Sequence, residues 1–152
     1  MAGTKLKLLK EAVGFILDTL NDKDRLSLVS FNDKAKRLTP LQLVNKTNKK
    51  NIMNSVNAMK ASGGTDISGA MDICFNILKQ KQYHNPINSV LLLSDGDDEE
   101  AYELIKQRSE SLKFSQGFTI NTFGLGADHD AILLDDIAKI RDGSFYYIEK
   151  AD

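Results

Sequence analysis

An apolar run followed at once by Ser-Asp-Gly stands in the middle of this 152-residue chain. Residues 90–93 are all Val or Leu, which is typical of a strand buried on both faces in a parallel sheet covered by helices. Open α/β sheets bind ligands at the carboxyl ends of their strands, so Asp95 is a candidate site residue. Gly96 can adopt a positive φ and turn the chain away from it. The alternative is that Asp95 only caps a helix beginning near Glu99.

Helical and extended segments alternate along the rest of the chain. Apolar spacing predicts helices over residues 4–20, 48–60, 67–78, 99–113 and 128–141, and strands over residues 25–31, 35–38, 118–123 and 144–148. The segment 35–38 is basic and is closed by Pro40, so we expect it at the rim of the sheet. This order predicts a single-domain α/β fold, a doubly wound and mostly parallel sheet with helices on both faces and one antiparallel edge strand.

The amino-acid composition argues against several classes of partner and of stabilising cross-link. Hydrophobic content of 41% and charged content of 27% are ordinary for a globular protein. A net charge of −1 argues against a nucleic-acid or anionic-membrane partner held by bulk charge. The single cysteine, Cys74, excludes an internal disulfide framework, and its place on an apolar helix face predicts inert packing. We expect a cytoplasmic protein without membrane spans.

The motifs of common enzyme classes are missing from the sequence. There is no phosphate-binding G-x-x-x-x-G-K-[ST] loop, and Ser94 lacks the G-x-S-x-G context of a nucleophile. His84 and His129 stand in polar segments, where we expect them to be solvated rather than catalytic. We therefore expect no enzymatic activity.

Six short stretches give the chain a resemblance to the von Willebrand factor type A domain over essentially its whole length, residues 1–152. They are Met1-Ala2-Gly3-Thr4-Lys5-Leu6, Asp24-Arg25-Leu26-Ser27-Leu28-Val29-Ser30-Phe31, Gly63-Gly64-Thr65-Asp66, Leu91-Leu92-Leu93-Ser94-Asp95-Gly96, Thr122-Phe123-Gly124-Leu125-Gly126 and Gly143-Ser144-Phe145-Tyr146-Tyr147. Each is weak alone, but their order and spacing are specific. The chain is most similar to the intracellular subgroup found in some ubiquitin-ligase and copine-like proteins.

The resemblance implies a metal-ion-dependent adhesion site at the carboxyl edge of the sheet. In that family an Asp-x-Ser-x-Ser motif ends the opening strand, and two further loops supply a threonine and an aspartate, which the match places at Thr65 and Asp95. Oxygen ligands of this kind suit Mg²⁺, or Mn²⁺ or Ca²⁺ in its place. A protein partner would then offer an acidic side chain to the metal.

The chain departs from the family at the first of these loops. It begins at the residue that follows the Asp-x-Ser-x-Ser motif in relatives, so the domain is truncated at its amino end and both motif and opening strand are absent. We expect Thr65 and Asp95 alone to bind a cation weakly or not at all. The missing strand would lie between residues 25–31 and 90–93, and an empty slot there costs about 1–3 kcal/mol for each unsatisfied backbone group.

Three arrangements could relieve that cost. The strand could be donated by another chain, the two flanking strands could close on each other, or the natural protein could carry the strand upstream of Met1, which is our expectation.

For polar residues near Thr65 and Asp95, a structural role is favoured over a role in metal binding. For residues 97–100, Asp-Asp-Glu-Glu, an acidic helix start is favoured over metal-attracting charge, and for Asp66 helix capping is favoured over ligation. Residues 145–147 are expected to pack on an edge strand rather than to stack on bases. Two functions remain open, a cation-dependent protein-binding module and a cation-independent scaffold with a vestigial site. Either could belong to a larger RING-type ubiquitin ligase.

Overall fold

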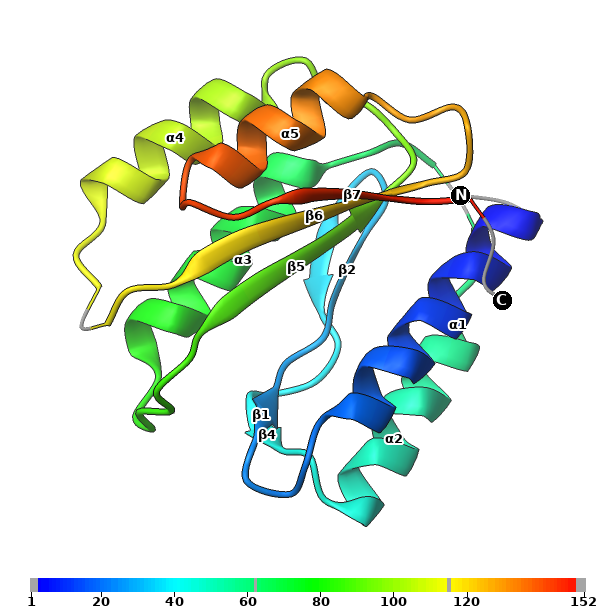
Figure 1. Cartoon of the computed structure of the whole chain (residues 1–152), viewed down its shortest axis with the longest axis vertical. Helices are drawn as coiled ribbons and strands as arrows, with labels where there is room; N and C mark the ends of the chain where they lie inside the picture. The colour runs from blue at the N-terminus through cyan, green and yellow to red at the C-terminus, as the bar shows by residue number, and fades with distance from the viewer. Residues whose placement is uncertain (1–2, 62, 115, 150–152) are drawn as a thin grey trace.

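A computed structural model describes residues 3–61, 63–114 and 116–149, and it forms an α/β fold with one parallel sheet and two short antiparallel pairs (Figure 1). Strands β5 (Ser89–Ser94), β6 (Thr119–Leu125) and β7 (Phe145–Ile148) make the parallel sheet. Strand β1 (Arg25–Leu26) pairs with β4 (Gln42–Leu43), and β2 (Val29–Phe31) pairs with β3 (Ala35–Arg37). The helices are α1 (Thr4–Thr19), α2 (Lys46–Asn57), α3 (Ile67–Gln80), α4 (Ala101–Ser111) and α5 (Ala131–Lys139).

The helices form two layers, one on each side of the parallel sheet (Figure 1). Helices α3, α4 and α5 cover one face, where Val90 and Leu92 of β5 and Ile120 of β6 join their core. Helix α1 covers the other face near the carboxyl ends of the strands, where Leu93 and Leu125 pack against the helix. Successive strand residues point to opposite faces, so β5 contributes to both cores. None of the described helices has the length and apolar character needed to cross a membrane.

Two reciprocal hydrogen bonds hold α1 against α2. Lys10 Nζ of α1 donates to the carbonyl of Asn57, the last residue of α2, at 2.9 Å. Lys49 Nζ of α2 donates to the carbonyl of Leu20, the C-cap of α1, also at 2.9 Å. Each ammonium therefore satisfies a free carbonyl at the negative end of the neighbouring helix. Val13, Leu17, Ile52 and Val56 fill the space between the helices.

The predicted strand at residues 25–31 is divided into β1 and β2. At the break, the backbone N–H of Leu28 donates to Thr39 Oγ1 at 2.8 Å, and Ser27 Oγ donates to the Thr39 carbonyl at 2.6 Å. The Thr39 side chain thus takes the place of a regular strand partner. The rim position predicted for residues 35–38 is confirmed, because β3 pairs only with β2 among the described strands. Strand β4 was not predicted.

Strand β5 is an edge strand of the parallel sheet as the structure describes it. It pairs with β6 on one side, and no described strand pairs with its other side. The prediction that residues 90–93 are buried on both faces is wrong for Leu91, which is 38% exposed because α1 covers that face only farther along the strand. Strands β2 and β5 belong to separate sheets, so the flanking strands do not close on each other.

Candidate functional site

The loops that follow β5 and precede α3 meet at the carboxyl edge of the sheet. A methyl group added to Gly96 would lie 2.5 Å from Thr65 Oγ1 and 2.9 Å from Thr65 Cγ2, so Thr65 lies against the residue next to Asp95. The loop of Thr65 therefore meets the loop that carries Asp95. The reason for Gly96 differs from the prediction. The positive-φ glycines among the described residues are Gly3, Gly63 and Gly126, so Gly96 serves close approach rather than a left-handed turn.

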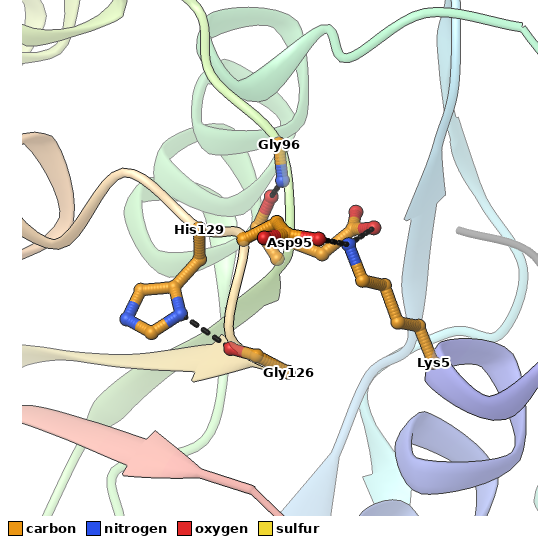
Figure 2. Close-up of polar contacts among 7 residues, drawn as sticks. Lys5, Asp95, Gly96, Gly126 and His129 are labelled. Atoms are coloured by element: carbon orange, nitrogen blue, oxygen red, sulfur yellow. Dashed lines mark hydrogen bonds and ion pairs between the residues drawn. The ribbon is translucent and has the colours of Figure 1, made fainter.

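Lys5, in the first turn of α1, reaches into this site (Figure 2). Its Nζ lies 3.3 Å from Asp95 Oδ2 and 4.0 Å from Asp128 Oδ2. The Asp95 side chain is only 18% exposed, whereas that of Asp128 is 91% exposed, so the contact with Asp95 is the better shielded of the two. The ammonium group therefore occupies space beside Asp95 that an approaching cation would need. Sequence reasoning missed this role, although Lys5 lies within a quoted stretch.

Asp33 positions the loop that carries Thr65, and this was not predicted. Its Oδ1 accepts a hydrogen bond from the Gly64 N–H at 2.5 Å. A methyl group on Gly63 would collide with the Asp33 carboxylate, and Gly63 has a φ of 64°. Glycine is therefore required at this position both for space and for backbone conformation. The Asp66 N–H also donates to the Asn32 carbonyl at 2.8 Å. The consecutive glycines thus let the β2–β3 turn dock against the Thr65 loop.

Two acidic residues cap α3 rather than face a ligand. Asp66 is its N-cap and accepts from the Gly69 N–H at 2.9 Å, which confirms the predicted capping role. Asp98 accepts from the N–H groups of Ile67 at 3.1 Å and Ser68 at 3.4 Å. The prediction that residues 97–100 start their own helix is therefore incomplete. Asp98 stabilises the amino end of α3, while α4 begins at Ala101 without a side-chain cap from Glu100.

His129 is packed, which corrects the prediction that it is solvated. Its Nδ1 lies 2.6 Å from the Gly126 carbonyl oxygen (Figure 2). Its ring centroid lies 5.5 Å from that of Phe145 and 5.0 Å from that of Tyr147. The ring also covers Gly124 so closely that a methyl group there would overlap it. His129 therefore fixes the β6–α5 loop that carries Asp128. His84 is exposed, as expected, and its Nδ1 lies 3.2 Å from Gln116 Oε1.

Cys74 and residues 145–147 have structural roles in the fold, as predicted. Cys74 packs against the α3–α4–α5 core, and burial raises the pKa of its thiol to about 11. Residues 145–147 lie on β7, which pairs only with β6 in the described sheet, as the edge-strand prediction requires. Met1 and Ala2, part of the first quoted stretch, lie outside the described residues.

The donor set does not fit a divalent cation unaided. In the part of the chain that the structure describes, no three His, Cys, Asp or Glu residues converge on one point. Thr65 and Asp95 together offer one hydroxyl and one carboxylate, whereas Mg²⁺ takes six oxygen ligands and gives up its waters reluctantly. A positive Lys5 beside Asp95 opposes a second cation further. Binding would require ligands from outside these residues.

The fold and the site define a class, an α/β protein with polar loops gathered at the carboxyl edge of a parallel sheet. The chain belongs to the von Willebrand factor type A domain family, whose profile matches residues 1–152. The structure of a von Willebrand factor type A protein from Catenulispora acidiphila superposes with a TM-score of 0.80 at 22% identity, covering 97% of this chain and 35% of that one.

Other relatives differ in context. The E3 ubiquitin-protein ligase WAV3 of Arabidopsis thaliana is 30% identical over 110 residues, which are 72% of this chain and 15% of the ligase. An uncharacterized protein of Synechocystis is 28% identical over 149 residues, 98% of this chain and 35% of that protein. The chain thus spans about a third or less of these relatives. A mussel byssus protein, proximal thread matrix protein 1, solved with a zinc-occupied MIDAS motif, superposes with a TM-score of 0.70 at 22% identity, covering 93% and 36%.

Proposed function

We propose that this chain is a protein-protein interaction module whose contact surface lies at the carboxyl edge of the sheet, around Thr65 and Asp95. The observation that carries the proposal is the contact of Thr65 with Gly96, which sets the hydroxyl beside the loop of Asp95. Asp33 and the capping carboxylates hold both loops in place. A surface fixed in this way is preorganised for a partner and loses little entropy on binding.

The cation enters the proposal only with further ligands. The mussel protein of similar fold, solved with a zinc-occupied MIDAS motif, supports a divalent cation as part of this proposal. In this chain Thr65 and Asp95 would hold one part of the coordination shell, with Mg²⁺, Mn²⁺ or Ca²⁺ as the ion. When bound, the ion would supply positive charge for an acidic side chain of the partner.

We also propose that the partner protein supplies an extended strand, in addition to the acidic side chain that would contact the ion. One side of β5 carries backbone N–H and C=O groups that no described strand satisfies. An extended segment that added there would form main-chain hydrogen bonds and cover Leu91. If that segment ended in carboxylate or hydroxyl side chains, it would also bring missing ligands to Asp95, because parallel strands end at the same edge.

The alternative is a cation-independent scaffold, and the ion pair of Lys5 with Asp95 favours it. The ammonium already neutralises the Asp95 carboxylate, so the edge could bind a protein without a metal. Relatives named as E3 ubiquitin-protein ligases support a context in which this domain recognises proteins while a neighbouring RING-type domain catalyses. In either case we propose a cytoplasmic domain that binds and does not itself catalyse.

Calorimetric titration with Mg²⁺ and Mn²⁺ separates these two functions. With an added extended segment that ends in carboxylate or hydroxyl side chains, the cation-dependent module predicts heat for the native chain that disappears in Asp95→Ala. Absence of heat in both proteins supports the scaffold. Peptides selected from a displayed library on the native chain should lose about tenfold or more in affinity for a variant carrying Asp97→Arg, an exposed change at the same edge. Equal affinity for both proteins would move the contact surface elsewhere.

A further inference from the structure

Charge is distributed unevenly along the chain. Residues 1–60 contain twelve Lys and Arg against five Asp and Glu, whereas residues 61–152 contain eight against sixteen. The net charge of −1 therefore conceals a basic first part and an acidic second part. Bulk charge argues against an anionic partner for the whole chain, but a local surface can still attract one.

Much of the positive charge lies on α1 and α2. These helices carry six lysines, Lys5, Lys7, Lys10, Lys46, Lys49 and Lys50, against two acidic residues on α1 and none on α2. The pair lies on the opposite side of the sheet from α3, α4 and α5 (Figure 1). Lys7, Lys46 and Lys50 are exposed, and among the described contacts only Lys7 has an acidic partner, Glu11 at 3.9 Å. An exposed pair at that distance neutralises little of the surface charge.

A groove of about 530 Å³ runs between the same two helices. Gly14 and Met53 line it together, and a methyl group on Gly14 would come no closer to Met53 than 3.9 Å. On α1 the lining extends from Gly3 to Gly14, which is about 16 Å or three helical turns. Phe15 is 71% exposed and lies one helical turn beyond Glu11, which lines the groove. The large apolar side chains of the lining are Leu6 and Met53, and a methionine adapts to irregular apolar partners.

We propose that the α1–α2 groove binds an acidic amphipathic helix of a partner protein. The groove would take apolar side chains spaced three and four residues apart, and its length matches about three turns of such a helix. Acidic side chains on the flanks of that helix would face the exposed Lys7, Lys46 and Lys50. Lys10 and Lys49 are already committed to the helix–helix hydrogen bonds and are left aside.

The test uses the full chain and a labelled 18-residue peptide with leucines at helical spacing and glutamates elsewhere, followed by fluorescence anisotropy. We expect binding that weakens about tenfold between low and moderate salt. The double variant Lys7→Glu/Lys50→Glu should weaken it by a further tenfold or more, and Phe15→Ser by several-fold. The matched control Lys106→Glu/Lys113→Glu makes the same change of charge at exposed positions far from the groove and should alter affinity less than twofold.

Four outcomes would overturn the proposal. The control pair could weaken binding as much as the groove pair, or a peptide of the same composition with scattered leucines could bind equally well. Vesicles containing phosphatidylserine could bind through Lys7 and Lys50 while the peptide does not. Sedimentation could show self-association that Lys7→Glu/Lys50→Glu abolishes, making a second copy the occupant. Asp95→Ala should leave peptide binding unchanged, so this test is independent of the carboxyl-edge function.

Discussion

Lys5 Nζ lies 3.3 Å from Asp95 Oδ2 and ties the first turn of α1 to the carboxyl end of β5 (Figure 2). The two residues are 90 positions apart in the sequence, and their contact places a fixed positive charge where the family resemblance implies a metal ion. Whether the edge of the sheet responds to cations therefore depends on this one side chain as well as on the ligands.

Removal of the Lys5 charge should strengthen cation binding. With the same ligand-supplying segment present, we expect Lys5→Met to bind Mn²⁺ about tenfold more tightly than the native chain, because repulsion between the ammonium and the ion is lost. Paramagnetic resonance of free Mn²⁺ measures the affinity. Lys7→Met is the matched control, since Lys7 is exposed and pairs with Glu11 instead. Equal affinities of the two variants would show that Lys5 does not compete with the cation.

Gly96 should be intolerant of a side chain because of Thr65. We expect Gly96→Ala to lower the free energy of unfolding by about 1–3 kcal/mol, since the new methyl would lie 2.5 Å from Thr65 Oγ1. In a Thr65→Ala background the cost should fall, because Oγ1 and Cγ2 are gone and only Cβ, at 3.2 Å, remains close. Urea unfolding of the four proteins gives the coupling energy. Additive effects would mean that the two residues do not touch.

Two helix-associated glycines should respond in opposite directions to alanine. Gly14→Ala should raise the free energy of unfolding by about 0.5–1 kcal/mol, because Gly14 is inside α1 and the methyl makes only an ordinary contact with Met53. Gly143→Ala should lower it by about 3 kcal/mol, since the methyl would overlap the Ile120 carbonyl. Thermal unfolding detects both. A stable Gly143→Ala protein would contradict the close packing of the α5–β7 turn against β6.

The open side of β5 should accept an extended peptide. We expect the amides of β5 that do not bond to β6 to exchange hydrogen quickly, and to slow when a synthetic strand rich in valine and isoleucine is added. Hydrogen exchange read residue by residue measures this, and β7, the opposite edge of the same sheet, is the internal control. Protection that appears on β7 rather than on β5 would show that the peptide adds to β7, which would contradict the prediction.

Cys74 should be inert while the protein is folded. Its thiol pKa is raised from 9.0 to about 11 by burial, so at pH 8 the thiolate fraction falls about a hundredfold. Reaction with a disulfide reagent should be slower than in the unfolded chain by at least that factor. The raised pKa also contributes to the free energy of unfolding. That contribution is fully present below pH 9 and is lost as the pH rises toward 11, and Cys74→Ala should not show this loss. Comparable reactivity in both states would mean that the thiol is exposed.

The predicted elements were recovered because each rests on local periodicity. The helices ended within a few residues of their predicted limits, and the rim position of β3 followed from its charge and proline. The division of the strand at residues 25–31 could not be predicted, because it depends on Thr39, more than ten residues away. Asp98 was misread for a similar reason, since its partners at the start of α3 are 30 and 31 positions distant.

The sequence alone determined the α/β order and the carboxylate at the end of β5, because both follow from local patterns that the chain carries whether or not it is folded. The pairing of Asp95 with Thr65 as candidate site residues came from the resemblance to the family. Only the tertiary structure decided that Lys5 lies beside Asp95, that His129 is packed, and that β5 keeps an open side. Each of these depends on contacts between distant segments, and such contacts are set by packing around the sheet rather than by the residues next in line.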